Sequence, residues 1–363
     1  LLIYSLYIFY YLYPLFSRVI YLFFTIGTHL LAYTERAQYN SCGDRQKMNE
    51  FLITLATVGI MLAYAVPGYI LIKVKAVKAD GISAFSKLLM YVCQPFLTLY
   101  SFNRAEFTPE LGINLLIFFA LVTALQLAFI GIMCLIFRKK RDDVRYRVAS
   151  IASVLSNCSF LGVPILEALF PDWANAPAYS MVFFFSMSLL GWTLVSAVYT
   201  LDRRYISVKK ALLNPATISL VVALPFFLTG FKISAENGWF LGQLENMITV
   251  LARMTTPLCM LIMGMRLATV PVKSIFTEPL AYLCIAIKQI VFPLVTLGLL
   301  TLMGPDEELQ WCMYVMCACP IASLVLNYAE LVGQGREMAA KCVLLGTISC
   351  VVTLPLLSLL IGV

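Results

Sequence analysis

Ser156-Asn157-Cys158-Ser159-Phe160-Leu161-Gly162-Val163-Pro164 interrupts one apolar segment of this chain with polar residues, glycine and proline. A second apolar segment is interrupted in the same way by Cys317-Ala318-Cys319-Pro320-Ile321-Ala322-Ser323, and Asn327 follows shortly after. In a bilayer, an interrupted helix frees backbone groups that lipid cannot hydrogen-bond, so it persists only inside protein or beside a wet cavity. Two such breaks in corresponding halves of a chain are the best sequence indication of a transporter's solute site.

The composition predicts an integral membrane protein. The chain is 61% hydrophobic and 12% charged, with a mean hydropathy of +0.89, whereas soluble domains have roughly 45–50% apolar and about 25% charged residues. A helix needs about 20 apolar residues to cross a bilayer. On that criterion the sequence predicts an all-α fold with ten spans, at about 51–72, 82–102, 111–137, 148–169, 178–200, 216–231, 247–271, 279–303, 311–332 and 338–362.

The basic residues predict how these spans are oriented. Loops on the cytoplasmic side carry the excess of lysine and arginine. The odd-numbered loops hold seventeen basic residues and the even-numbered loops hold two. The distribution therefore predicts a multi-pass protein of the cytoplasmic membrane with both termini outside. It also accounts for the net charge of +7 as topology, so we expect no nucleic-acid partner.

The prolines predict an internal duplication. Pro95 and Pro164 are 69 residues apart, and Pro257 and Pro320 are 63 apart, so each half has a proline in its second span and a broken fourth span. Because five spans per half is an odd number, the second half must be inserted upside down. We therefore expect two inverted five-helix repeats, at 48–200 and 201–363, an arrangement found in secondary transporters.

Residues 1–47 differ from the rest of the chain. They are rich in Tyr, Phe and Leu, contain no methionine, and end in a polar stretch before Met48. They fit either an additional amphipathic or spanning segment, or translated sequence upstream of the true start. We favour a non-native upstream extension and leave 1–47 out of the functional argument.

Several ordered motifs resemble the auxin efflux carrier family of membrane transport proteins. They are the first break itself, Leu213-Asn214-Pro215-Ala216, Thr256-Pro257-Leu258-Cys259-Met260-Leu261-Ile262-Met263-Gly264, and the closing stretch from Cys319-Pro320 through Tyr328-Ala329-Glu330-Leu331-Val332-Gly333 to Leu354-Pro355-Leu356. The resemblance covers essentially 49–363. The central loop, 201–215, is short, which favours the compact microbial type that resembles malate and malonate permeases.

The resemblance implies a fold like that of bile-acid symporters and sodium/proton antiporters, in which the proline-broken fourth and ninth helices cross. By analogy, spans 1, 2, 6 and 7 form a scaffold, and spans 3–5 and 8–10 form a mobile core that moves as an elevator. The implied function is secondary transport of a small organic anion, a mono- or dicarboxylate of malate, malonate or auxin type. The alternative on the same fold is cation-coupled symport of a sterol-like or other solute. A membrane sensor is a third interpretation. The expected partners are the anion, the lipid bilayer, a coupled proton or sodium ion, and a second copy through the scaffold helices.

The breaks supply the candidate solute-binding residues. Broken helices offer free N–H groups and positive dipole ends, which suit carboxylates, and the neighbouring side chains add adjustable donors and acceptors. Glycine would let a solute approach the backbone, and proline breaks the helix without needing to touch the solute. The candidates are Asn157, Ser159, Gly162, Pro164, Cys319, Pro320, Ser323 and Asn327.

Ionisable residues inside a membrane are costly and are functional candidates by default. Lys288, Arg253 and Glu330 are therefore candidate charge or coupling residues. Catalysis is not expected: the single histidine, His29, precedes Met48, and neither His-Glu-x-x-His nor Gly-x-Gly-Asp occurs. The cysteines fall mostly inside spans as reduced packing residues, so we expect no cofactor and no metal site.

Overall fold

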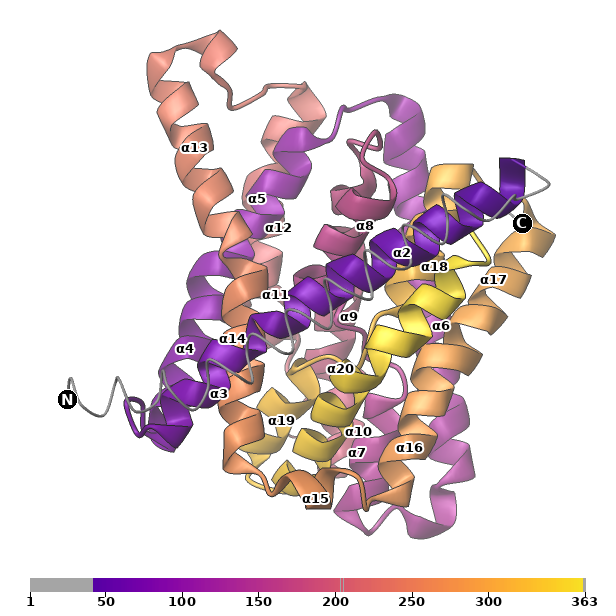
Figure 1. Cartoon of the computed structure of the whole chain (residues 1–363). Coiled ribbons are helices and arrows are strands. Elements are labelled where there is room, and N and C mark those ends of the chain that lie inside the picture. The colour runs from indigo at the N-terminus through magenta and orange to yellow at the C-terminus, as the bar shows by residue number, and fades with distance from the viewer. Residues whose placement is uncertain (1–41, 203, 205, 362–363) are drawn as a thin grey trace.

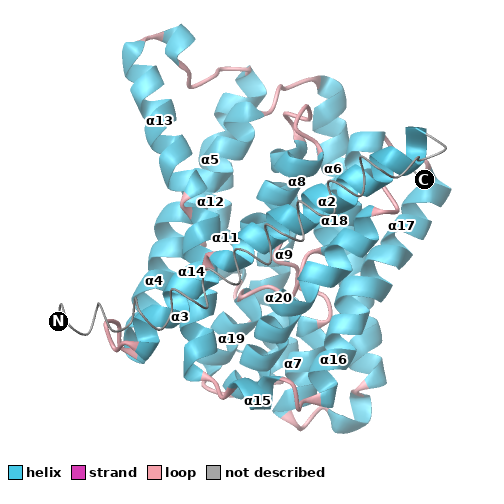
Figure 2. Cartoon of the chain, viewed as in Figure 1, coloured by secondary structure: helices cyan, strands magenta, loops and turns pink. Residues whose placement is uncertain are grey.

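The computed structural model describes residues 42–202, 204 and 206–361, and this part of the chain is helical throughout, without strands (Figure 2). Residues 1–41 of the predicted extension lie outside the described residues, and 42–47 form the start of the first helix. The first half contains α2 (Cys42–Ala63), α3 (Ala65–Lys73), η1 (Ala79–Gly81), α4 (Ile82–Leu88), η2 (Leu89–Cys93), α5 (Gln94–Arg104), α6 (Pro109–Ile136), η3 (Arg138–Lys140), α7 (Val144–Ala152), η4 (Cys158–Gly162), α8 (Val163–Leu169), α9 (Ala176–Leu190), η5 (Gly191–Val195) and α10 (Ser196–Thr200). The second half contains α11 (Val208–Leu212), α12 (Pro215–Thr229), η7 (Ala235–Asn237), α13 (Trp239–Arg253), α14 (Thr255–Thr269), α15 (Val272–Ile275), α16 (Pro279–Ala286), η8 (Ile287–Val291), α17 (Phe292–Met303), α18 (Glu307–Ala318), α19 (Leu324–Val332) and α20 (Arg336–Ser358).

Seven helical stretches of the described chain are long and apolar enough to cross a membrane. They are Gln46–Lys73, Ala79–Arg104, Pro109–Ile136, Ala176–Thr200, Trp239–Thr269, Pro279–Met303 and Arg336–Ser358. Two shorter apolar helices, Cys158–Leu169 and Pro215–Thr229, fall within other predicted spans. The prediction of an all-α, multi-pass membrane protein is confirmed, while the count of ten spans and the inverted repeat stay predictions.

Two of the long stretches widen into a π-helical turn just before a proline. η2 precedes Pro95, and η8 precedes Pro293. Proline has no N–H to donate to the carbonyl four residues earlier, and its ring crowds that carbonyl. The carbonyls concerned belong to Tyr91 and Gln289, and both lie inside the π turns. The helices therefore continue past their prolines at the cost of one irregular turn.

The tightest helix packing joins the first stretch to the seventh predicted span. α3 packs along α14, and a Cβ added at Gly264 would overlap the carbonyl oxygen of Ala65, while one at Gly68 would overlap that of Leu261. Small residues allow this backbone approach, and close packing is a main source of helix association in lipid. We call the contact of Gly68 with Leu261 and of Gly264 with Ala65 the glycine crossing. α5 packs in turn against α12 and α13, and α2 runs obliquely across the face of the bundle (Figure 1).

Loops of the same parity meet at the same end of the bundle. In the odd-numbered loops, Arg147 donates to Gln334 at 3.4 Å. In the even-numbered loops, the Glu106 N–H donates to the Asn175 side chain at 3.0 Å, and that side chain donates to Glu308 at 3.4 Å. The contacts therefore join odd-numbered loops to each other and even-numbered loops to each other, which are the basic-rich and basic-poor groups of the sequence.

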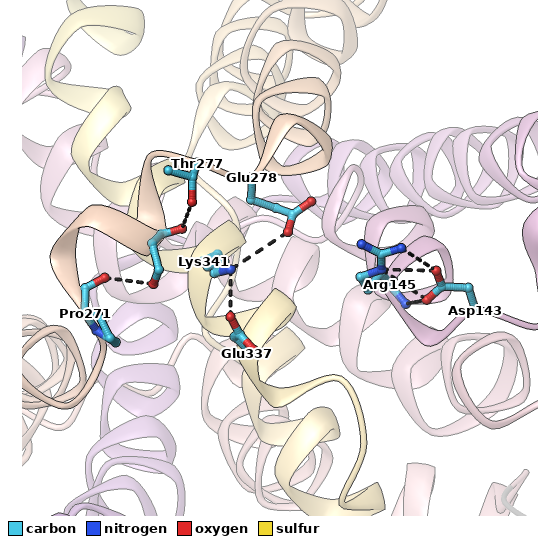
Figure 3. A network of polar contacts seen from close by, with 8 residues as sticks. Asp143, Arg145, Pro271, Thr277, Glu278, Glu337 and Lys341 are labelled. Carbon is cyan, nitrogen blue, oxygen red and sulfur yellow. Dashed lines mark hydrogen bonds and ion pairs between the residues drawn. The ribbon is translucent and has the colours of Figure 1, made fainter.

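Polar contacts gather at the basic end of the bundle in separate groups (Figure 3). Lys341 of α20 lies 2.7 Å from Glu337 one turn earlier and 3.9 Å from Glu278, which precedes α16. Asp143 caps α7 by accepting from the Arg145 N–H at 2.9 Å, and hydrogen bonds from the Arg145 side chain lower the pKa of that carboxyl. Lys341 therefore links α20 to the start of α16, while the Asp143 cap stabilises the start of α7.

Candidate functional site

The two breaks cross each other and satisfy each other's backbone. The Asn157 N–H donates to the Pro320 carbonyl at 2.8 Å, and the Ala322 N–H donates to the Leu155 carbonyl at 3.0 Å. Ser156 and Ile321 thereby form an isolated antiparallel bridge. Backbone groups freed inside a membrane must find partners within the protein, and here each break supplies them to the other. We call this contact of 155–157 with 320–322 the broken-span crossing.

Lys288 stabilises the end of α18 at this crossing. Its side chain is fully buried, and its Nζ donates to the carbonyls of Cys317 at 2.5 Å and Cys319 at 3.0 Å. These carbonyls end α18, so they carry the partial negative charge of a helix C-terminus. The ring centroid of Phe292 lies 5.1 Å from the same Nζ. The ammonium thus provides both hydrogen bonds and charge where the helix stops.

A small cavity, partly open to its surroundings, lies beside the crossing. Its walls come from α4, η2 and α14 on one side and from the two breaks on the other, so it lies between the predicted scaffold and the predicted core. Seven of its ten lining residues are polar or sulfur-containing, and three are apolar or aromatic. The lining residues are Ser86, Leu89, Met90, Phe160, Cys259, Ile262, Met263, Arg266, Ser323 and Asn327.

Arg266 is the charged group in the lining of this cavity. Its side chain is 10% exposed and forms an ion pair with Glu330 of α19. Its Nη2 also donates to Ser86 Oγ at 3.2 Å, whereas its Nε has no hydrogen-bond partner among the described residues. A guanidinium carries five N–H donors in a planar fork that matches a carboxylate. One donor of this cation is therefore left without a partner among the described residues.

The predicted residues of the first break lie mostly behind the cavity. Asn157 is buried, and its side chain lies close to Cys259, which does line the cavity. Ser159 is buried, and Pro164 lies in the first turn of α8. A Cβ at Gly162 would lie 2.7 Å from Met316, so the space beside this glycine holds a side chain of α18.

The predicted residues of the second break divide between the crossing and the cavity. The carbonyls of Cys319 and Pro320 accept from Lys288 and Asn157 respectively. Ser323 and Asn327 line the cavity, and the Asn327 Nδ2 donates to Met90 Sδ at 3.4 Å. α19 begins directly after Ser323, so its positive end points to the same region.

The predicted charged residues are not brought together. Arg253 is exposed at the last position of α13, and Lys288 is enclosed at the broken-span crossing. Neither is among the described residues that line the cavity. Glu330 reaches the cavity indirectly, through its ion pair with Arg266.

The sequence reasoning missed Arg266 as a site residue. It was counted with the basic residues of the seventh loop, although it lies within the predicted span 247–271. An ionisable residue inside a predicted span is itself a functional signal. That signal, applied to every charged residue rather than only to Lys288, Arg253 and Glu330, identifies Arg266.

No cluster of three or more His, Cys, Asp or Glu residues that could hold a metal occurs in the described part of the chain. The cysteines whose side chains the structure describes are free thiols, and nearly all are buried. The site is therefore built from amide, hydroxyl, guanidinium and backbone groups.

In a comparison with known families, residues 52–204 and 200–358 match a family model described as membrane transport protein. A comparison with curated proteins gives no match.

Proposed function

Because the chain belongs to the membrane transport protein family, which includes the auxin efflux carriers, we propose that it is a secondary active transporter of small organic anions. The family is one of transporters rather than of enzymes, and the apolar helices make this member a multi-pass membrane protein. The single observation that carries the choice of an anion is the cavity beside the broken-span crossing, lined by the buried guanidinium of Arg266.

The lining favours a particular kind of anion. One cation, Arg266, faces the cavity, and the apolar side includes Leu89, Phe160 and Ile262. A single guanidinium balances one carboxylate, and the apolar wall suits a hydrocarbon or aromatic body. Within the class of mono- and dicarboxylates, we therefore favour a monocarboxylate with an apolar body. The alternative, cation-coupled symport of a sterol-like solute, gives Arg266 no role in holding the solute.

The proposed mechanism is alternating access by an elevator movement. The ten-span architecture with two inverted repeats is supported by paired contacts, since α3 packs on α14 and α5 packs on α12. The first contact joins spans 1 and 7, and the second joins spans 6 and 2. In an inverted repeat, span 1 corresponds to span 6 and span 2 to span 7, so the two contacts are equivalent. The segregation of the loops by parity supports crossing of the cytoplasmic membrane with both termini outside. The core would carry the solute past the scaffold formed by spans 1, 2, 6 and 7.

In this proposal the candidate residues have different roles. Ser323 and Asn327 contact the solute, and α19 directs its N-terminal N–H groups towards it. Asn157 acts through Cys259, while Lys288 keeps the second break in shape. Glu330 is the candidate for coupling to a proton. The remaining partner proposal is a homodimer through the scaffold, where α12 and α13 present exposed apolar side chains such as Val221 and Trp239.

The test compares two arginines in proteoliposomes. We expect exchange of labelled benzoate, an apolar monocarboxylate, to exceed exchange of malonate in the parent. Arg266→Gln should weaken benzoate binding at least tenfold, because a hydrogen bond to a charged group contributes about 1.5–3 kcal/mol. Arg253→Gln, the same change at an exposed arginine, should leave benzoate binding unaltered. Exchange that survives Arg266→Gln, or that fails for every carboxylate in the parent, would refute the proposal.

A further inference from the structure

Two arginine–glutamate pairs occupy matching places in the two halves of the chain. Arg104 lies nine residues after Pro95, and Arg266 lies nine residues after Pro257. Each arginine pairs with a glutamate on the second half-helix of the broken span in its own half, Glu167 on α8 and Glu330 on α19. The sequence separations are 63 and 64 residues. The two pairs thus offer the same chemistry in two surroundings.

The pair in the first half is closed upon itself. Arg104 Nη1 lies 2.6 Å from Glu167 Oε1, and the Tyr100 hydroxyl donates to the same oxygen at 2.9 Å. The two charged side chains are 36% and 31% exposed. Neither residue is among those that line the cavity. This pair links a scaffold helix to a core helix without meeting a solute.

The pair in the second half is unequal. Arg266 is 10% exposed and lines the cavity, whereas the Glu330 side chain is 38% exposed. The arginine is held in place by Ser86 as well as by the glutamate. Releasing Glu330 from the pair costs less than releasing Arg266, because the glutamate side chain is already partly exposed whereas the arginine is almost enclosed.

We propose that Glu330 is an internal competitor for the solute: its carboxylate occupies Arg266 in the empty carrier, and the carboxylate of the bound anion takes its place. This inference rests on the proposed function and adds how the site is regulated. A second carboxylate beside an intact Arg266–Glu330 pair would leave one negative charge unbalanced in a poorly hydrated region, which is unfavourable. Replacing the Glu330 carboxylate with the carboxylate of the anion leaves one negative charge paired with the Arg266 guanidinium.

The surroundings of Glu330 accommodate its release. The guanidinium of Arg336, at the start of α20, lies 3.5 Å from the Glu330 backbone carbonyl oxygen, so a second cation is held at the same residue. The exchange also removes an ion pair between α14 of the scaffold and α19 of the core. Binding of the anion would thereby loosen the core from the scaffold on this side, and departure of the anion would restore the pair. Competition from Glu330 also keeps the affinity for the anion low enough for the anion to be released.

The experiment measures benzoate affinity by calorimetry on purified protein in detergent. Glu330→Gln keeps the shape of the side chain but removes its charge, and we expect benzoate to bind about fivefold more tightly, since a partly exposed ion pair is worth up to about that factor. Glu167→Gln, the matched change in the first-half pair, should leave the affinity within twofold of the parent. The gain from Glu330→Gln should vanish in an Arg266→Gln background.

Each outcome has a defined meaning. Unchanged or weaker binding in Glu330→Gln overturns the competitor, as does an equal gain in Glu167→Gln, which would indicate general loosening of the carrier. If the parent binds no benzoate, the proposed function itself fails, and the two failures are thus distinguished. Should Glu330→Gln not fold, Glu330→Asp withdraws the carboxylate by one methylene. A smaller gain in that variant supports the proposal, and no gain overturns it.

Discussion

The glycine crossing and the broken-span crossing both bring two helical segments into backbone contact, but by opposite means. At the glycine crossing, α3 and α14 stay helical and approach through Gly68 and Gly264. At the broken-span crossing, the helices stop, and Asn157 and Ala322 donate to carbonyls of the other break. One contact depends on shape and the other on hydrogen bonds.

This difference teaches where rigidity and adaptability reside. Backbone packed against backbone has no freedom to yield, and interiors are dense enough to transmit any added volume. Hydrogen bonds of an unwound segment can exchange partners, and side chains such as Met316 and Lys288 can change rotamer. The glycine crossing therefore lies where the proposed scaffold would need stiffness, and the broken-span crossing lies beside the cavity.

The largest expected effect comes from adding one methyl group to the glycine crossing. Gly264→Ala would place Cβ against the Ala65 carbonyl and close to the Tyr69 nitrogen, and both are backbone atoms. α3 must move as a whole, so we expect a loss of about 3 kcal/mol of stability, the upper part of the range for overpacking. The measurement is chemical unfolding in detergent micelles. Gly298→Ala is the control, because nothing lies within 4 Å of a Cβ at that position. Equal stability of the two variants would contradict a rigid glycine crossing.

A smaller loss is expected when the polar support of the broken-span crossing is removed. Lys288→Met preserves side-chain length but leaves the carbonyls of Cys317 and Cys319 without this donor. Leaving buried acceptors unsatisfied costs about 1–3 kcal/mol. Part of this cost is offset because the variant no longer has to bury a charged ammonium. We expect a net loss of about 2 kcal/mol in the same unfolding measurement.

Lys87→Met provides the control for that variant, because Lys87 is an exposed lysine of α4. It should unfold like the parent. A Lys288→Met protein as stable as the parent would mean that the ammonium does not hold the end of α18, and that this crossing is stabilised by its backbone bonds alone.

Much of the fold could be predicted because it follows from local sequence. Apolar length marks the spans, and Pro164 and Pro320 mark breaks because each stands among polar and small residues, whereas the helices continue past Pro95 and Pro293. The parity of the basic loops follows from charge alone. The family resemblance is confirmed by the family match.

The candidate site was less accessible because its groups meet across distant segments. No spacing rule indicates that Lys288 reaches carbonyls about thirty residues away, or that Arg266 faces a cavity rather than a loop. Gly162 is a similar case. The sequence predicts that a solute approaches this glycine, but in the structure the Met316 side chain fills the space beside it. Such contacts depend on side-chain direction and helix crossing, which periodicity does not specify.

The smallest expected effect concerns that same glycine. Gly162→Ala adds the methyl group tested at Gly264, but here Cβ meets the Sδ and Cε atoms of Met316 at 2.7 Å. A methionine side chain is unbranched and adaptable, so it can turn away, and we expect a loss of about 1 kcal/mol or less. Combining Gly162→Ala with Met316→Ala removes the obstacle, so the double variant should lose less stability than the two single changes predict together. The opposite outcome is that Gly162→Ala loses as much stability as Gly264→Ala and that Met316→Ala does not reduce the loss. The broken-span crossing would then be as rigid as the glycine crossing, which would contradict an adaptable break.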